Sequence, residues 1–168
     1  MEQSISPRGA LKLMTVTVDN SEGLTRVIFG IKFFGMTRGE LNPGVIKTFI
    51  RAGNAIITVE SKSTGKWYTY KIRRKDGKNC WYVYLLTGPD NISNYSYIGK
   101  LHDNGRFYRK VEGAGAKGFE WLWGASEGKI GEQAVVMHEG RCGRCGRRLT
   151  VPESVYTGYG PECIRFMI

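Results

Sequence analysis

Residues 55–87 read AIITVESKSTGKWYTYKIRRKDGKNCWYVYLLT, and this stretch decides the fold. It contains three runs rich in β-branched and aromatic residues, at 55–61, 67–74 and 80–87, which predict β-strands. Polar and glycine residues separate the runs and predict turns. Strands joined by such short turns pair antiparallel with their neighbours along the chain, so we expect hairpins here and no crossover connections.

The same pattern continues beyond residue 87. Two more strands are predicted at 95–101 and 106–111, each preceded by turn-forming residues. A further short strand is expected at 133–137. The sequence therefore predicts an α+β protein whose sheet is an antiparallel β-meander of about five strands.

Short helices are expected to flank this meander. Asn42 can cap a helix that begins at Pro43, and Gly53 can end it. A second helix is predicted within 115–125 and is followed by a linker at 126–131.

The N-terminal part of the chain predicts a separate β-hairpin region over residues 1–41. Strands are expected at 11–18 and 24–34, with a cluster of turn-forming residues between them. The pairing of these two strands would give the hairpin.

Four potential metal ligands, His138, Cys142, Cys145 and Cys163, follow the pattern H-x3-C-x2-C-x17-C. Structural zinc sites hold four such ligands in a tetrahedron, and one histidine with three cysteines is a common set. Because protein side chains fill all four positions, the pattern predicts one structural zinc ion and no catalytic one. A redox-active C-x2-C pair is the alternative, but it requires neither the histidine nor the third cysteine.

Glycines and a proline around these ligands agree with a metal site. Gly143 and Gly146 directly follow the two cysteines of the pair and relieve the steric cost of a tight turn. Gly160 and Pro161 predict a helix start, which places Cys163 in a first turn whose free N–H groups favour a thiolate.

The segment from residue 132 to residue 168 is therefore predicted to be a small zinc-ribbon-like or treble-clef-like module. We expect a knuckle around the cysteine pair, a short hairpin at 149–156 and a terminal helix at 162–167.

Composition limits the class of protein. The chain has 168 residues, of which 41% are hydrophobic, and this is enough for a buried core. It begins without the basic and apolar segments of a signal peptide, and no apolar run approaches the roughly 20 residues of a membrane helix. We expect a cytoplasmic protein with no membrane partner, in which reduced thiols favour metal binding over disulfides.

Nearly all of the net charge of +10 comes from residues 42–111, which hold thirteen basic and four acidic side chains. Such a block is typical of proteins that bind phosphate backbones, although a charged surface that only confers solubility is the alternative. In the second strand, alternation places Trp67, Thr69, Lys71 and Arg73 on one face. Bases can stack on such rings while the cations contact phosphates, which favours single-stranded nucleic acid. Rings that serve only as good strand formers are the alternative.

The candidate nucleic-acid contacts are basic and aromatic side chains of the meander and arginines near the cysteine pair. They are Lys66, Trp67, Lys71, Arg73, Arg74, Lys75, Arg106, Arg109, Lys110, Arg144, Arg147 and Arg148.

The sequence shows no residue pattern typical of catalysis. No Ser-His-Asp or Cys-His set occurs in a supporting context, and the glycine-rich segment 113–118 lacks the spacing of a phosphate-binding loop. Cys80 is expected to be a small buried residue, and His102 a surface residue. We therefore predict that the protein is not an enzyme and has no small-molecule substrate.

The C-terminal sequence HEGRCGRCGRRLTVPESVYTGYGPEC, at 138–163, resembles the last module of an uncharacterised family that is widespread in bacteriophage genomes. Members carry a CGRCGR-L-T-P-E-S motif followed by G-x-GPEC. Earlier stretches, such as LLTGPDN at 85–91 and FEWLW at 119–123, are similar to segments that precede that module. The resemblance covers about residues 48–165. It implies a phage origin and a ligand role for the predicted histidine and three cysteines, and it implies no catalytic residue.

These features predict three regions, an N-terminal hairpin region at 1–41, a basic sheet domain at 42–131 and a zinc-binding module at 132–168. The expected function is that of a phage-encoded, non-enzymatic nucleic-acid-binding protein in the host cytoplasm, with single strands favoured. The alternative is a phage inhibitor that binds a host protein complex, such as a bacterial immune system, in the manner of an anti-CRISPR protein.

Overall fold

The structure is a computed structural model that describes residues 14–18, 26–30, 39–75 and 77–167. Contacts divide the chain into two compact units, residues 1–36 and 37–168. In the first unit, β1 (Met14–Val18) pairs antiparallel with β2 (Arg26–Gly30), which confirms the predicted hairpin. The outer ends of both predicted strands, and the predicted turn between them, lie outside the described residues.

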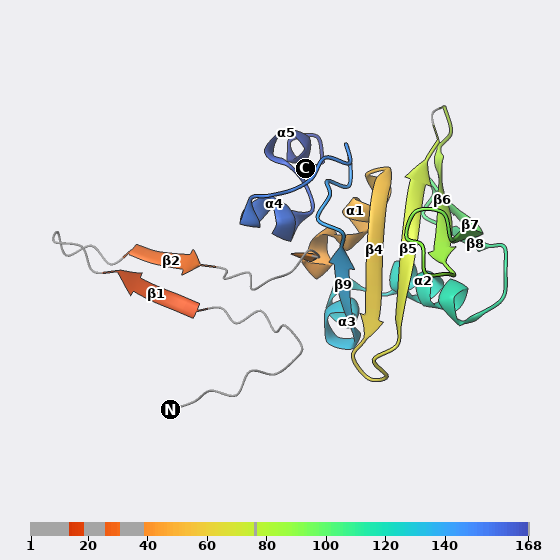
Figure 1. Ribbon diagram of the computed structural model, residues 1–168, viewed down its shortest axis with the longest axis horizontal. Coiled ribbons are helices and arrows are strands. Elements are labelled where there is room, and N and C mark those ends of the chain that lie inside the picture. The colour runs from red at the N-terminus through yellow and green to blue at the C-terminus, as the bar shows by residue number, and fades with distance from the viewer. Residues whose placement is uncertain (1–13, 19–25, 31–38, 76, 168) are drawn as a thin grey trace. The chain divides into compact units, whose positions relative to one another are not determined.

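The second unit is built on a seven-stranded antiparallel sheet with the order β3-β9-β4-β5-β6-β7-β8 (Figure 1). Its strands are β3 (Gly39–Glu40), β4 (Asn54–Ser61), β5 (Trp67–Arg74), β6 (Cys80–Leu86), β7 (Tyr95–His102), β8 (Phe107–Arg109) and β9 (Ala134–His138). The predicted α+β class and the five-stranded meander, which runs from β4 to β8, are confirmed.

Two strands outside the meander extend the sheet beyond β4. The strand predicted at 133–137 is present as β9, which pairs with β4 through partners such as Thr58 and Met137. β3 pairs in turn with β9. The segment predicted as a zinc module therefore begins as a strand of the same sheet as the meander.

Short helices flank the sheet, as the sequence predicts. They are η1 (Pro43–Val45), α1 (Ile46–Arg51), α2 (Ala114–Gly124), α3 (Glu127–Gln133), α4 (Pro152–Thr157) and α5 (Pro161–Ile164). Asn42 caps η1, because its side-chain oxygen accepts a hydrogen bond from the Gly44 N–H at 2.9 Å. Within the described ranges, no helix has the length and apolar character needed to cross a membrane.

Two of the predicted segments are wrong. The linker expected at 126–131 belongs mostly to α3, because Ser126 caps that helix at the Lys129 N–H and Ile130 is buried. The hairpin expected at 149–156 is largely replaced by α4, which begins at Pro152 and ends at a left-handed Gly158.

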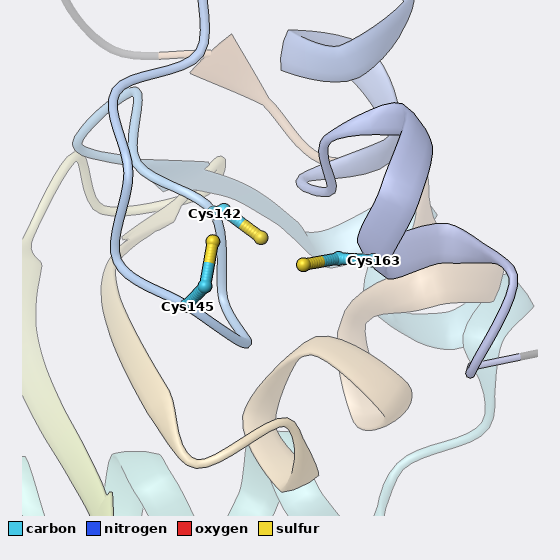
Figure 2. Close-up of side chains that lie close together, drawn as sticks. All are labelled: Cys142, Cys145 and Cys163. Atoms are coloured by element: carbon cyan, nitrogen blue, oxygen red, sulfur yellow. The ribbon is translucent and has the colours of Figure 1, made fainter.

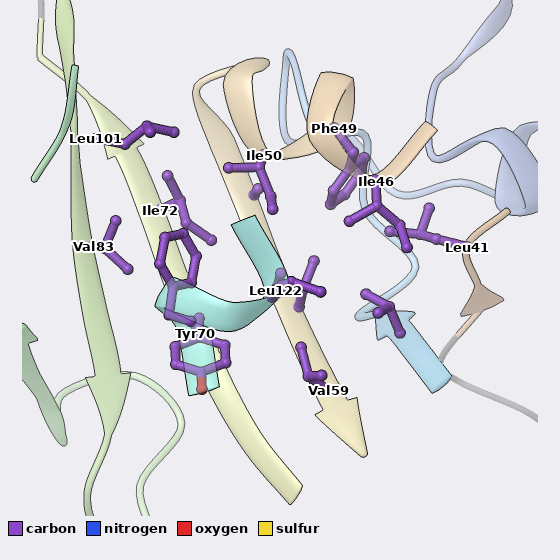
Figure 3. Packing of buried hydrophobic residues seen from close by; sticks show 14 of the residues in the cluster. Leu41, Ile46, Phe49, Ile50, Val59, Tyr70, Ile72, Val83, Leu101 and Leu122 are labelled. Atoms are coloured by element: carbon purple, nitrogen blue, oxygen red, sulfur yellow. The ribbon is translucent and has the colours of Figure 1, made fainter. Parts of the chain in front are cut away.

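The hydrophobic core lies on one face of the sheet (Figure 3). Alternate residues of the central strands point into it, among them Ile57 of β4, Ile72 of β5 and Val83 of β6, and all three are fully buried. α1, α2 and α3 complete the core with Phe49, Ile50, Phe119, Leu122 and Ile130. These three helices therefore cover the face of the sheet that carries the core, and they do not cover the opposite face.

Tyr70 joins β5 to α2 inside this core. Its hydroxyl donates a hydrogen bond of 2.7 Å to the Gly115 carbonyl, and its ring packs edge-on against Phe119. We expect Tyr70→Phe to lower the free energy of unfolding by about 1–2 kcal/mol, because a buried carbonyl loses its donor. Urea denaturation measures the loss.

The matched control is Tyr82→Phe, which removes the hydroxyl of a partly exposed tyrosine on the opposite face and should cost less than about 0.5 kcal/mol. Equal stability of the two variants would contradict the role of the buried hydrogen bond.

Candidate metal centre and tyrosine face

The cysteine pair lies in a tight loop formed by residues 140–149. The ends of the loop are joined by a hydrogen bond of 2.8 Å from the Leu149 N–H to the Gly140 carbonyl. Gly146, directly after the second cysteine, has a φ of +74°, so a turn that favours glycine is confirmed at this position.

Gly143 is required for a different reason from the one predicted. A Cβ at this position would lie 2.7 Å from the ring of Phe49, and a Cβ at Gly158 would lie 2.5 Å from the same ring. Phe49 also packs edge-on against Tyr159, with 5.8 Å between the ring centroids. The two glycines therefore let the cysteine loop and the end of α4 close on the Phe49 side chain of α1.

Cys142 has the environment of a metal-binding thiolate. Burial raises the pKa of the thiol, but hydrogen bonds from the backbone N–H groups of Arg144, Cys145 and Gly160 outweigh this effect and lower it. These N–H groups stabilise the deprotonated sulfur, which is the form that binds a metal ion.

Cys163 reaches the same point from the opposite side. Pro161 begins α5 as predicted, and Cys163 lies in this first turn. Burial raises the pKa of the Cys163 thiol, so the turn alone does not favour the thiolate as predicted. The Sγ atoms of Cys142, Cys145 and Cys163 lie within 4.8 Å of one another, and Figure 2 shows the side chains converging from the loop and from α5. Cys142 and Cys163 are buried, whereas Cys145 is exposed, so the cluster reaches the surface at Cys145.

The structure does not bring His138 into this cluster. Its Nε2 lies 2.7 Å from the Val155 carbonyl, which can only accept, so Nε2 carries the proton. Nδ1 then accepts a hydrogen bond from the Gly140 N–H at 3.2 Å. Burial lowers the pKa of His138, which agrees with this neutral form, and the ring packs beside Phe49 at 5.5 Å between centroids. Both nitrogens are engaged, and His138 is a core residue in this geometry.

Three cysteine sulfurs at this separation fit a soft or borderline metal ion, for which zinc is the usual biological choice. Cys142 and Cys145 would hold the ion from the loop and Cys163 from α5. A bound ion would thereby fix α5 to the loop. Cys80, the fourth cysteine of the sequence, is buried at the start of β6, as predicted, and does not join the cluster.

The second face of the sheet carries rings and cations. Cross-strand pairs place Lys71 beside Tyr84, and Arg73 and Lys100 on either side of Tyr82. We call this surface the tyrosine face, and it consists of Trp67, Lys71, Arg73, Tyr82, Tyr84, Tyr95, Tyr97 and Lys100. Because α1, α2 and α3 bury their apolar residues in the core, these side chains remain partly or fully exposed.

Contacts between rings and cations order the tyrosine face. Tyr97 lies 5.7 Å from Tyr84 and 6.1 Å from Tyr82, measured between ring centroids. Lys100 Nζ lies 5.6 Å from the centre of the Tyr82 ring. Lys71 Nζ lies 4.1 Å from the centre of the Tyr95 ring. The rings therefore form a connected strip across β6 and β7, with cations along it.

Lys71, Arg73 and Lys100 of the tyrosine face form no ion pair among the described residues. Burial lowers the pKa of Lys71 and of Arg73, and the charge of Arg73 lowers the pKa of Lys71 further. Two carboxylates act on these cations at a distance and partly oppose this effect, because Glu139 raises the pKa of Lys71 and of Arg73, and Asp90 raises that of Lys71. Two cations held this close favour a bound anion.

A hollow of about 340 Å³ lies at one end of the tyrosine face. It is lined by three cations and two rings, Arg73, Arg74, Lys75, Tyr82 and Tyr84. A phosphate group placed there could contact the cations while a base lies against a ring.

The cysteine loop borders the same end of the sheet. Asn54, at the start of β4, pairs with Arg73 of the tyrosine face. Its backbone N–H donates to the Gly143 carbonyl at 2.8 Å, and its side-chain amide donates to the Arg144 carbonyl at 2.7 Å. Asn54 thus joins the loop to the strand next to the tyrosine face.

The predicted nucleic-acid contacts occupy different surroundings. Trp67, Lys71 and Arg73 lie on the tyrosine face, and Arg74 and Lys75 line its hollow. Arg144, Arg147 and Arg148 are exposed on the cysteine loop, and Arg106 and Lys110 are exposed on either side of β8. Lys66 lines a separate cavity.

Arg109 does not share the tyrosine face. It forms ion pairs with Glu112 at 2.9 Å and with Glu120 of α2 at 2.5 Å. Its charge is already compensated inside the protein, so it is a poor candidate for a phosphate contact.

The predicted nucleic-acid contacts lack five residues of the tyrosine face, Tyr82, Tyr84, Tyr95, Tyr97 and Lys100. Simple alternation along β7 would place Tyr97, Gly99 and Leu101 on one face. The register of β6 and β7 shifts between Val83 and Tyr84, which interrupts the alternation along β7. Lys100 therefore lies opposite Tyr82 on the tyrosine face, and Leu101 is buried in the core. Gly99 was the available signal, because glycine inside a strand often marks a bulge.

A larger cavity, of about 710 Å³, lies between the β4–β5 turn and α2. Its lining includes Tyr68, Tyr70 and Trp121, with Lys62 and Lys66 at its edge. Its volume is typical of sites for small ligands.

Comparison with known proteins identifies a match for the C-terminal segment. Residues 132–167 match a family of unknown function, DUF6011. No curated protein and no solved structure matches the chain. The part of the chain that carries the cysteine cluster, from the end of α3 through α5, is therefore similar to this family.

Proposed function

We propose that this protein binds single-stranded nucleic acid on its tyrosine face. The observation that carries the proposal is the strip of tyrosine rings on β6 and β7, flanked by cations that form no ion pair among the described residues.

Rings and cations have separate tasks in such a surface. Exposed bases stack on tyrosine rings at about 1–3 kcal/mol each, without requiring a particular sequence. Phosphates bind Lys71, Arg73 and Lys100 and release counterions, which makes the affinity depend on salt. The hollow beside Arg73 would hold a phosphate at the end of the strip.

The cysteine cluster has a supporting role in this proposal. Cys142, Cys145 and Cys163 hold one zinc ion, which fixes the loop that carries Arg144 and is joined to β4 by Asn54. The ion is structural in this role. A non-enzymatic protein of phage origin in the host cytoplasm remains our prediction.

Anisotropy of a labelled oligothymidylate tests the proposal. We expect binding at low salt, with log K falling linearly against log salt. Tyr84→Leu should weaken binding about tenfold, because the loss of one stacked base at about 1–3 kcal/mol corresponds to this order. Arg73→Gln should reduce the salt slope by about one.

Lys129→Gln is the matched control for Arg73→Gln, because it removes one exposed positive charge from α3, which packs against the other face of the sheet. Its salt slope should equal that of the wild type. Absence of binding at low salt would refute the proposal, and capture of a host protein complex would then support the inhibitor alternative.

A further inference from the structure

The cysteine cluster supplies three sulfur ligands, whereas zinc in proteins takes four ligands. If the protein supplied the fourth ligand, the ion would be coordinated by protein side chains alone. If it does not, the fourth coordination position is open to a ligand from another molecule. This question concerns the proposed zinc site and is independent of nucleic-acid binding.

The side chains best suited to provide a fourth ligand are engaged elsewhere. His138 donates from Nε2 to Val155 and accepts at Nδ1 from Gly140. The rings of His102 and Tyr108 pack together with 4.9 Å between their centroids. Cys80 is the cross-strand partner of His102 in the pairing of β6 with β7. No described aspartate or glutamate belongs to the cluster. The sequence has two histidines and four cysteines, and none of them lies in residues 1–38.

We propose that the fourth ligand is exchangeable and that the site accepts a thiolate from another molecule. In the isolated protein, a water molecule would occupy the fourth coordination position of the zinc ion. The ligand is a small thiol or a cysteine side chain of a different protein.

Access to the cluster supports this proposal. Cys145 is exposed, while Cys142 and Cys163 are buried beneath it, so an incoming ligand can approach from the side of Cys145.

Charge around the cluster favours an anionic ligand. Zinc with three thiolates has a formal charge of about −1, and a fourth thiolate would bring it to about −2. Arg141, Arg144, Arg147 and Arg148 are exposed on the cysteine loop. Four guanidinium groups on or beside the loop offset the added charge.

Tyr159 offers a hydrogen-bond donor for the incoming sulfur. It is 3% exposed, and its hydroxyl has no hydrogen-bond partner among the described residues. Tyr159 lies beside the cysteine loop, because the N–H of Gly143, the residue after Cys142, donates to the carbonyl of Gly158 at 3.0 Å. A buried donor without an acceptor is costly, and a bound thiolate would supply the acceptor.

Ligand exchange at this site needs no oxidant or reductant. With the ion held by Cys142, Cys145 and Cys163, an incoming thiol would release its proton to solvent and take the place of one water molecule. The three protein cysteines remain thiolates throughout.

Cobalt(II) substitution tests the proposal, because the absorption spectrum reports the number of sulfur ligands. In thiol-free buffer we expect a spectrum of three sulfurs and one oxygen. Addition of 2-mercaptoethanol should strengthen the sulfur-to-metal charge-transfer band and saturate at one thiol per metal. Tyr159→Phe should bind cobalt but need several-fold more thiol to reach half-saturation.

A dilution series without added thiol is the control, because Cys80, the cysteine outside the cluster, is buried and leaves a second copy of the chain no exposed thiolate to supply. The three-sulfur spectrum should stay the same on dilution, and a four-sulfur spectrum before thiol is added would overturn the proposal. A spectrum unchanged by thiol at every protein concentration would overturn it.

His138→Gln completes the design, since glutamine can keep one donor and one acceptor. The starting spectrum of this variant should equal that of the wild type, and a change that removes a nitrogen ligand would overturn the proposal. Thiol affinity unchanged in Tyr159→Phe would overturn the assignment of Tyr159 as donor. If the wild-type protein did not bind cobalt at all, the metal site itself would be refuted.

Discussion

Cys142→Ser is expected to abolish stoichiometric zinc binding and to unfold the C-terminal cysteine loop. Cys142 is fully buried and receives three backbone N–H groups at its sulfur, which a metal-bound thiolate satisfies. Structural zinc sites contribute about 10–16 kcal/mol of binding free energy in zinc-finger peptides, and this energy stabilises the folded state. Metal analysis after dialysis against a weak chelator should give about one equivalent for the wild type and close to none for the variant.

Cys80→Ser is the matched control for this experiment. Cys80 is also buried and also a free cysteine, but it lies at the start of β6 and outside the cluster. The control should keep its full equivalent of zinc even if it loses some stability to the new hydroxyl. If Cys142→Ser kept as much metal as Cys80→Ser, the assignment of the cluster as the metal site would be wrong.

Phe49→Ala is expected to lower the free energy of unfolding by about 3–5 kcal/mol, as for other buried phenylalanines. We also expect the substitution to weaken zinc binding at the cysteine cluster. The Phe49 ring fills the space left by Gly143 and Gly158, and it contacts the ring of Tyr159. Removing it leaves a cavity directly beneath the cysteine loop, so zinc affinity should fall together with stability. Urea denaturation and competition with a chromophoric chelator measure the two effects separately.

Phe119→Ala separates the general loss of stability from the specific effect on the metal. Phe119 is as buried as Phe49, but it packs against Tyr70 and Phe107 under the meander. We expect a similar loss of stability with zinc affinity close to that of the wild type. A reduction in zinc affinity equal to that of Phe49→Ala would show that Phe49 has no particular connection with the cysteine loop.

Short-range patterns predicted the meander because each strand pairs with the next one along the chain. The turns carry their own signals, such as left-handed glycines at Gly65 and Gly77. The place of β9 beside β4 depends on core packing between distant segments, and no local pattern encodes it. The sequence of α3, EGKIGEQ, contains two glycines and has a poor helix propensity, which the burial of Ile130 outweighs.

The cysteine part of the site was predictable from spacing, but the histidine was not. A histidine four residues before a C-x2-C pair has the spacing of a ligand. In the fold, however, β9 pairs with β3 and β4, and His138 points into the core beside Phe49. Gly39 of β3 leaves room for its ring, because a Cβ there would lie 2.6 Å from Nε2. Only the pairing of β3 with β9 reveals this role.

Insertion of β9 next to β4 also constrains how the chain can fold during its synthesis. Thr58 of β4 cannot meet Met137 until most of the chain has left the ribosome. The meander can form early through local hairpins, but one edge of β4 then stays unpaired and Val59 and Ile57 lack part of their cover. Closure of that edge brings the cysteine loop to the end of β4, so we expect the sheet to be completed and the three cysteines to meet together, late in folding.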